Sequence, residues 1–171
     1  MARCKRSSSK SNAAQRRTAH PARTDVVSLV KADHRQVEGW FDALAGARSS
    51  RKKQTLASQI CAALRVATTI EEEIFYPAFL KATKDKDIHH EAVVEHDGAK
   101  KLIGPIEQSD PADDYFESKV NVLSEMIKHH AKEEEQADGM FAQARASKVD
   151  LEELGTELAS RKQELSGEMA G

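Results

Sequence analysis

The sequence predicts an all-α protein, in which four helices form an up-down-up-down bundle and a short fifth helix follows at the C-terminal end. Apolar side chains return every three or four residues along four long segments, which is the spacing of one face of a helix. Charged residues make up 32% of the chain and aromatic residues only 5%, and no stretch shows the alternation typical of a strand. The 171 residues are enough for one domain with a sizeable core.

The first two expected helices are separated by a short polar turn. The first begins at Thr24 or Asp25, because either side chain can cap a helix, and it ends near Gly46. The second runs from about Ser50 to about Thr83 and turns a stripe of leucine, isoleucine and alanine inward.

The later helices are marked by proline, glycine and aspartate. The third is expected over residues 85–103, where Gly104-Pro105 ends or kinks it. The fourth starts after Ser109-Asp110-Pro111, since a polar cap followed by proline is a start signal, and continues to Asp138-Gly139. The last is amphipathic, covers about residues 150–164 and is expected to pack across the bundle.

Three regions follow from this pattern: a basic tail over residues 1–24, the bundle over 25–146 and the C-terminal helix over 147–171. The tail carries seven basic side chains and no acidic one, which leaves 19 basic against 28 acidic side chains for the rest. We expect it to be disordered, because it has almost no large apolar side chains to bury. Its charge allows non-specific contact with nucleic acid or another anionic partner, and its Arg- and Ser-rich composition is also that of an organellar transit peptide.

The chain is expected to be a soluble cytoplasmic protein. No stretch approaches the ~18 consecutive apolar residues that a membrane span needs, and no signal peptide opens the sequence. Cys4 lies in the polar tail and Cys61 on a helical stripe, so we expect two reduced thiols and no disulfide framework.

Side chains of the metal-binding types interrupt the apolar stripes of all four long helices. His130 and Glu134 lie four residues apart and therefore project from one face. Burying unpaired polar and charged groups costs several kcal/mol each, so a cation between the helices is a better explanation than hydrogen-bonded core residues. The predicted ligands are His34, Glu71, His96, His130 and Glu134.

Other glutamates and histidines lie next to the predicted ligands in the sequence. Glu38, four residues after His34, is a candidate for an additional oxygen ligand, whereas Glu72, Glu73, Glu133 and Glu135 are assigned to solvated faces. His129 lies about 100° around the helix from His130, so we expect it behind the ligands or exposed. Mixed imidazole and carboxylate donors suit iron, manganese or zinc, and we expect iron.

Four segments, in this order, resemble the hemerythrin-like, or HHE cation-binding, family of four-helix bundles. The resemblance covers about residues 25–145. In that family the pattern His, His-x-x-x-Glu, His, His-x-x-x-Glu holds two non-haem irons bridged by oxygen, which implies the same five ligands here. The matching segments are Ala32-Asp33-His34-Arg35-Gln36-Val37, Thr69-Ile70-Glu71-Glu72-Glu73-Ile74-Phe75-Tyr76-Pro77-Ala78, Val94-Glu95-His96-Asp97-Gly98-Ala99-Lys100 and Ile127-Lys128-His129-His130-Ala131-Lys132-Glu133-Glu134-Glu135.

The sequence departs from that pattern at Ala67, where the family has a histidine four residues before Glu71. An alanine cannot ligate, so water, Glu38 or Glu72 takes its place, or one position binds weakly or not at all. The resemblance therefore implies a di-iron site of weakened or asymmetric occupancy. A mononuclear site, or a bundle that has lost its metal, is the second interpretation.

The function that follows is that of a non-haem iron-binding protein that binds or senses oxygen, peroxide, nitric oxide or iron. A non-catalytic role is favoured over an enzyme, because the sequence offers no evident proton-relay residue. The alternative is a mononuclear or metal-free bundle that serves as a protein or nucleic-acid interaction module through its basic tail.

Overall fold

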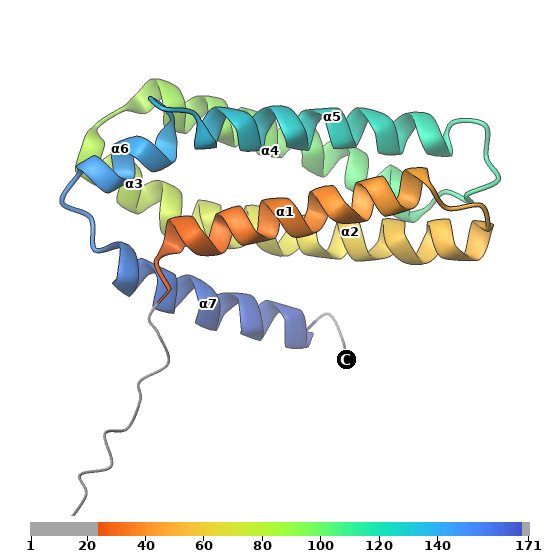
Figure 1. Ribbon diagram of the computed structural model, residues 1–171, viewed down its shortest axis with the longest axis horizontal. Coiled ribbons are helices and arrows are strands. Elements are labelled where there is room, and N and C mark those ends of the chain that lie inside the picture. The colour runs from red at the N-terminus through yellow and green to blue at the C-terminus, as the bar shows by residue number, and fades with distance from the viewer. Residues whose placement is uncertain (1–23, 169–171) are drawn as a thin grey trace, which may run out of the picture.

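The described part of the chain is entirely helical, as predicted. The computed structural model describes residues 24–168, so the expected tail lies outside this range except for Thr24. Four long helices lie side by side, and each runs back along the one before it (Figure 1). Within the described range, no helix is long and apolar enough to cross a membrane. The long helices are α1 (Val26–Ala45), α2 (Ser50–Ile70), α4 (Lys86–Glu107) and α5 (Phe116–Glu135).

Two shorter helices complete the structure after α5. The helix α6 (Met140–Ala146) folds back over one end of the bundle, and α7 (Leu151–Glu168) lies along its outside, against α1 and α2 (Figure 1). The last helix is about one turn longer than the expected 150–164, whereas α1 keeps its expected bounds. Asp25 caps α1 by accepting a hydrogen bond from the Ser28 amide at 3.0 Å.

The predicted second helix contains a π-helical turn. Its three consecutive pieces are α2, η1 (Glu71–Phe75) and α3 (Tyr76–Thr83). At this turn the Tyr76 amide donates to the carbonyl of Glu71, five residues earlier. The extra residue shifts the phase of the inward face, so Ile74 is only half-buried while Phe75 and Tyr76 are fully buried.

The third predicted helix does not end at Gly104-Pro105. Instead α4 continues through Pro105 to Glu107. Proline removes one backbone donor, but Ile106, the residue after it, is 1% exposed and belongs to the same core cluster as Ile103. The apolar contact keeps the last turn helical.

The fourth long helix begins later than the sequence predicts. Asp110 forms a turn rather than a helix cap: its carbonyl accepts from the Asp113 amide at 2.9 Å, and its Oδ1 accepts from the Ala112 amide at 2.8 Å. The helix α5 begins only at Phe116, the first fully buried residue after this turn.

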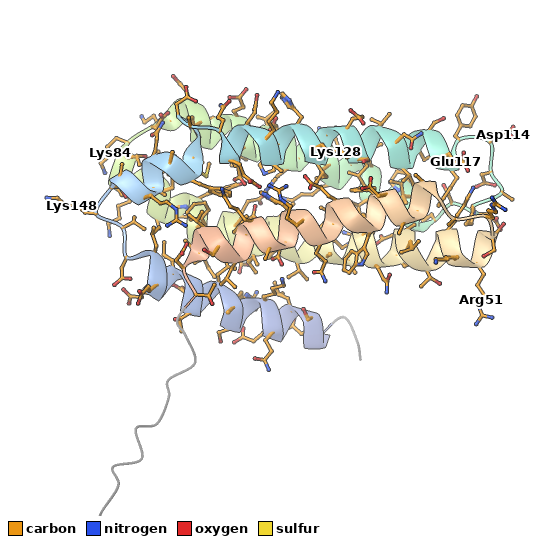
Figure 2. The ribbon with its side chains drawn as sticks, viewed as in Figure 1. Arg51, Lys84, Asp114, Glu117, Lys128 and Lys148 are labelled. Carbon is orange, nitrogen blue, oxygen red and sulfur yellow. The ribbon has the colours of Figure 1, made fainter. Side chains whose placement is uncertain are left out.

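The core consists of two apolar clusters with a polar layer between them. Along α1, Val30 belongs to one cluster and Val37 to the other, with His34 in between. Along α4, Ala92 and Ala99 flank His96 in the same way. Charged residues such as Lys84 and Lys148 at one end, and Arg51 and Asp114 at the other, lie outside this core (Figure 2).

The single cysteine of the described part lies in the larger cluster. Cys61 is a free thiol and is fully buried. Burial in apolar surroundings raises the pKa of the Cys61 thiol to about 12, so the thiolate form is scarce at neutral pH. Cys4 falls outside the described residues.

Close backbone contact joins α7 to the start of α1. A Cβ atom on Gly155 would lie 2.2 Å from the Thr24 carbonyl oxygen and 2.9 Å from the Val26 nitrogen. Only glycine allows this approach, and it lets Leu158, one turn later, become fully buried.

Replacing Gly155 by alanine is expected to push α7 away from α1 and to lower the free energy of unfolding by about 1–3 kcal/mol. Urea denaturation measures this change. The matched control is Gly167→Ala on the same helix, where the new methyl group meets nothing within 4 Å. Equal stability of the two variants would contradict the proposed close packing.

Candidate metal centre

The structure brings the five predicted ligands together in the polar layer. His34, Glu71, His96, His130 and Glu134 are each at most 8% exposed. Their donor atoms form two groups in which all atoms lie within 4.8 Å of one another, and His130 belongs to both. One group adds His34 and Glu134, and the other adds Glu71 and His96.

A tyrosine that the sequence analysis missed lies at the centre of this layer. The Tyr76 hydroxyl is in hydrogen-bonding contact with ligands from three helical segments. The distances are 3.3 Å to Glu71 Oε2, 3.1 Å to His96 Nε2, 3.4 Å to His130 Nε2 and 3.0 Å to Glu134 Oε1. On a regular α-helix, a residue five positions after Glu71 points about 140° away from it, and the π turn removes most of this offset.

Each buried imidazole also contacts a carboxylate through its outer nitrogen. Because a carboxylate only accepts, the Nδ1 atom of each ring carries the proton and donates. In a neutral ring this leaves Nε2 as an acceptor, directed into the layer. The three pairs are His34 Nδ1 with Glu135 Oε1 at 3.0 Å, His96 Nδ1 with Glu72 Oε1 at 3.0 Å and His130 Nδ1 with Glu95 Oε2 at 2.7 Å.

Surface cations stabilise two of these outer carboxylates. Arg35 donates to Glu135 at 2.6 Å, and Lys100 donates to both oxygens of Glu72 at 2.6 and 2.7 Å. Glu72, a candidate ligand by sequence, therefore lies behind His96 and is not among the inward donors. The sequence signal for these residues was adjacency, since Glu72, Glu95 and Glu135 each directly follow or precede a predicted ligand.

The inward-facing atoms of the layer fit a cation. The Nε2 atoms of His96 and His130 lie 3.2 Å apart, and when both rings are neutral neither Nε2 has a proton to donate to the other. One oxygen of Glu134, Oε2, is buried without a hydrogen-bond partner. The Tyr76 hydroxyl has one proton for all these acceptors. Several acceptors around one proton are an arrangement that a bound cation neutralises.

When no cation is bound, protons on the buried groups neutralise part of this layer. Burial, and next the charge of Glu71, raise the pKa of Glu134 well above its usual value. Burial would lower the pKa of His96, but hydrogen bonds and charges from Glu71 and Glu72 outweigh it and raise that pKa. Burial also raises the pKa of Tyr76. Metal binding would therefore displace protons from these groups, as it does at other sites of this chemistry.

The other predicted positions lie away from the inward donors. Glu38 is paired with Arg35 at 3.0 and 2.9 Å. The His129 side chain is 62% exposed and its Nε2 lies 3.2 Å from Glu133 on the surface. Ala67 is half-buried, and with His34 it lines a cavity.

A bundle of long helices with a buried layer of histidines and carboxylates is the arrangement expected of a helical cation-binding protein. Residues 25–142 match the family model of the hemerythrin HHE cation binding domain. The chain therefore belongs to this family, as the sequence motifs indicated.

Two similar proteins place the chain among its relatives. A hemerythrin HHE cation binding domain-containing protein of Mycobacterium kansasii shares the fold with a TM-score of 0.72 at 22% identity, over 85% of this chain and 89% of that one. A DNA nickase of Nostoc sp. is 25% identical over 149 residues, which are 86% of this chain and 42% of the nickase. The chain thus spans less than half the length of that relative.

Replacing Glu95 by glutamine is expected to weaken divalent metal binding about 10–100-fold, because His130 loses the anionic partner that orients its ring and raises its basicity. Isothermal titration with Fe(II) or Co(II) under anaerobic conditions measures the affinity. Glu125→Gln on the exposed face of α5 is the matched control. Equal affinities for the two variants would show that Glu95 does not support the site.

Proposed function

We propose that the protein is a non-haem iron protein that binds or senses a small molecule such as oxygen, peroxide or nitric oxide at a buried two-metal centre. The observation that carries the proposal is the layer of His, Glu and Tyr donors enclosed between two apolar clusters. Imidazole and carboxylate donors suit iron, manganese and zinc. A phenol oxygen, which also ligates iron in some haem proteins, favours iron.

The geometry supports a division of the ligands between two ions. His34 and Glu134 would hold one ion, Glu71 and His96 the other, with His130 near both. Tyr76 would supply an oxygen donor between the two ions, since its hydroxyl reaches Glu71 and His96 of one group and Glu134 of the other. Bound iron would supply a redox-active metal with a position for a small exogenous ligand.

The protein's own residues prepare this site in two ways. The outer carboxylates hold the imidazoles with Nε2 directed inward, so little reorganisation is needed when a cation enters. The apolar clusters on both sides exclude water and keep the local dielectric low. These features suit reversible ligand binding.

Reconstitution with Fe(II) in the presence of air tests the proposal. The wild-type chain is expected to hold close to two irons and to show a visible phenolate-to-iron absorption band. Tyr76→Phe is expected to lose this band and part of its iron. Tyr115→Phe, at the exposed second tyrosine of the chain, is the control and is expected to match the wild type.

Three outcomes of this experiment would count against parts of the proposal. A wild-type chain that takes up no iron would refute it, and a single iron would support the mononuclear interpretation instead. An unchanged spectrum of Tyr76→Phe would refute the role of the phenol. His130→Ala is expected to remove most iron, because both groups of donors include this residue.

A role in contact with DNA is a second candidate function. It rests on the similarity to a protein named as a DNA nickase and on the seven basic side chains before residue 24. Lysine and arginine neutralise phosphates without reading sequence, so such contact would be non-specific and sensitive to salt.

Deleting residues 1–23 separates the two candidates. We expect the shortened chain to keep its iron content and to lose at least tenfold in affinity for a double-stranded DNA oligonucleotide, measured by fluorescence anisotropy at low salt. The full-length chain is the control. Unchanged DNA affinity, or no binding by the full-length chain, would exclude the tail as a DNA contact.

A further inference from the structure

A cavity of about 400 Å³ lies between α1, α2 and α7, directly beside the metal centre. Its inner wall includes His34 and Ala67, and most of its other lining is apolar. A water molecule needs only about 10–15 Å³ on a comparable measure, so the space greatly exceeds what oxygen or peroxide requires. It falls within the range of about 300–1,000 Å³ typical of sites for small organic molecules.

The cavity reaches the centre because Ala67 stands where a histidine side chain would fill the space. Ala63, one turn earlier on α2, also lines it and leaves the same wall open. His34 therefore faces two environments: its Nε2 lies 3.5 Å from Glu134 Oε2 in the polar layer, while part of the side chain borders the cavity.

The remaining walls indicate what kind of molecule fits. Trp40 offers an aromatic surface against which a planar ring can pack. Asp33 and Lys162 both line the cavity and form an ion pair with each other, so their charges cancel. An ionic ligand would lose its hydration shell on entering the cavity and would find no free counter-charge there. A neutral ligand avoids this cost.

The helix that closes this side belongs to the part of the chain beyond the family match. The match ends at residue 142, whereas Lys162 and Ser166 of α7 line the cavity. The cavity is thus bordered by Ala67, where the chain departs from the family pattern, and by α7, which lies beyond the matched residues.

We propose that this cavity binds a neutral, largely apolar organic molecule, such as a fused-ring aromatic compound, with one end against His34. Binding rests on the cavity alone, and only its effect on the metal rests on the proposed function. A molecule held there would contact a ligand of the centre and change the surroundings of the metal next to it.

Titration of the full-length chain with 1-aminoanthracene tests the site. Trp40 is the single tryptophan of the sequence, so energy transfer from it to the probe reports binding. We expect saturable binding of one probe per chain, at least tenfold weaker in Ala63→Phe, which fills the cavity. Ala43→Phe on the exposed face of α1 is the matched control and is expected to bind like the wild type.

A charged probe and a second variant complete the experiment. Anthracene-9-carboxylate, which carries a charge, is expected to bind at least tenfold more weakly than the neutral probe. If Ala63→Phe does not fold, Ala63→Leu replaces it. No binding to the wild type, equal binding by the cavity variant and the control, or dimerisation that covers the cavity and excludes the probe would each overturn the proposal.

The iron-reconstituted chain separates this inference from the proposed function. There the neutral probe is expected to shift the visible absorption of the centre. Probe binding by a chain that takes up no iron would support the cavity and refute the iron centre. Iron uptake without probe binding would support the iron centre and refute the cavity as a binding site.

Discussion

The constraint on which the rest of the structure depends is the burial of several hydrogen-bond acceptors around one hydroxyl proton. Glu71, Glu134 and the inward nitrogens of His96 and His130 meet the Tyr76 hydroxyl in a layer with almost no access to water. Such a layer is costly unless protons or a cation neutralise it. The outer carboxylates and the surface cations beyond them follow from this need, because they hold each ring with its acceptor nitrogen inward.

Two differences lie close together on one helical segment, and the second depends on the π-helical turn. At Ala67 the chain lacks a donor that the family pattern places there, and nine residues later the extra residue of the turn brings Tyr76 to the face of Glu71. A regular helix would direct this tyrosine away from the layer. The polar layer therefore contains a phenol at its centre, and an open cavity borders it at His34.

The C-terminal helix gives the bundle a surface that four helices alone would not have. Gly155 lets α7 approach the start of α1, and Leu158 anchors it. From there the helix runs beside α2 and places Lys162 at the cavity. The packing of Gly155 and Leu158, which stabilises α7 on the bundle, therefore also positions one wall of the cavity beside the polar layer.

The sequence by itself determined the helical class, the main helices and the five residues that meet in the polar layer. Side chains three or four residues apart share one face of a helix whatever surrounds it, so the stripes that contain His34, Glu71, His96, His130 and Glu134 could be read locally. Helix ends were less predictable, because the contact of Ile106 with the core outweighs the adjacent proline.

Only the tertiary structure decided the position of Tyr76, the pairing of Glu72, Glu95 and Glu135 with histidines, and the cavity at Ala67. The π turn breaks the regular period on which sequence reasoning relies. The pairings join atoms from different helices, so they depend on how those helices pack. The cavity exists because α7 covers the gap beside Ala67 without filling it, a relation that no local pattern contains.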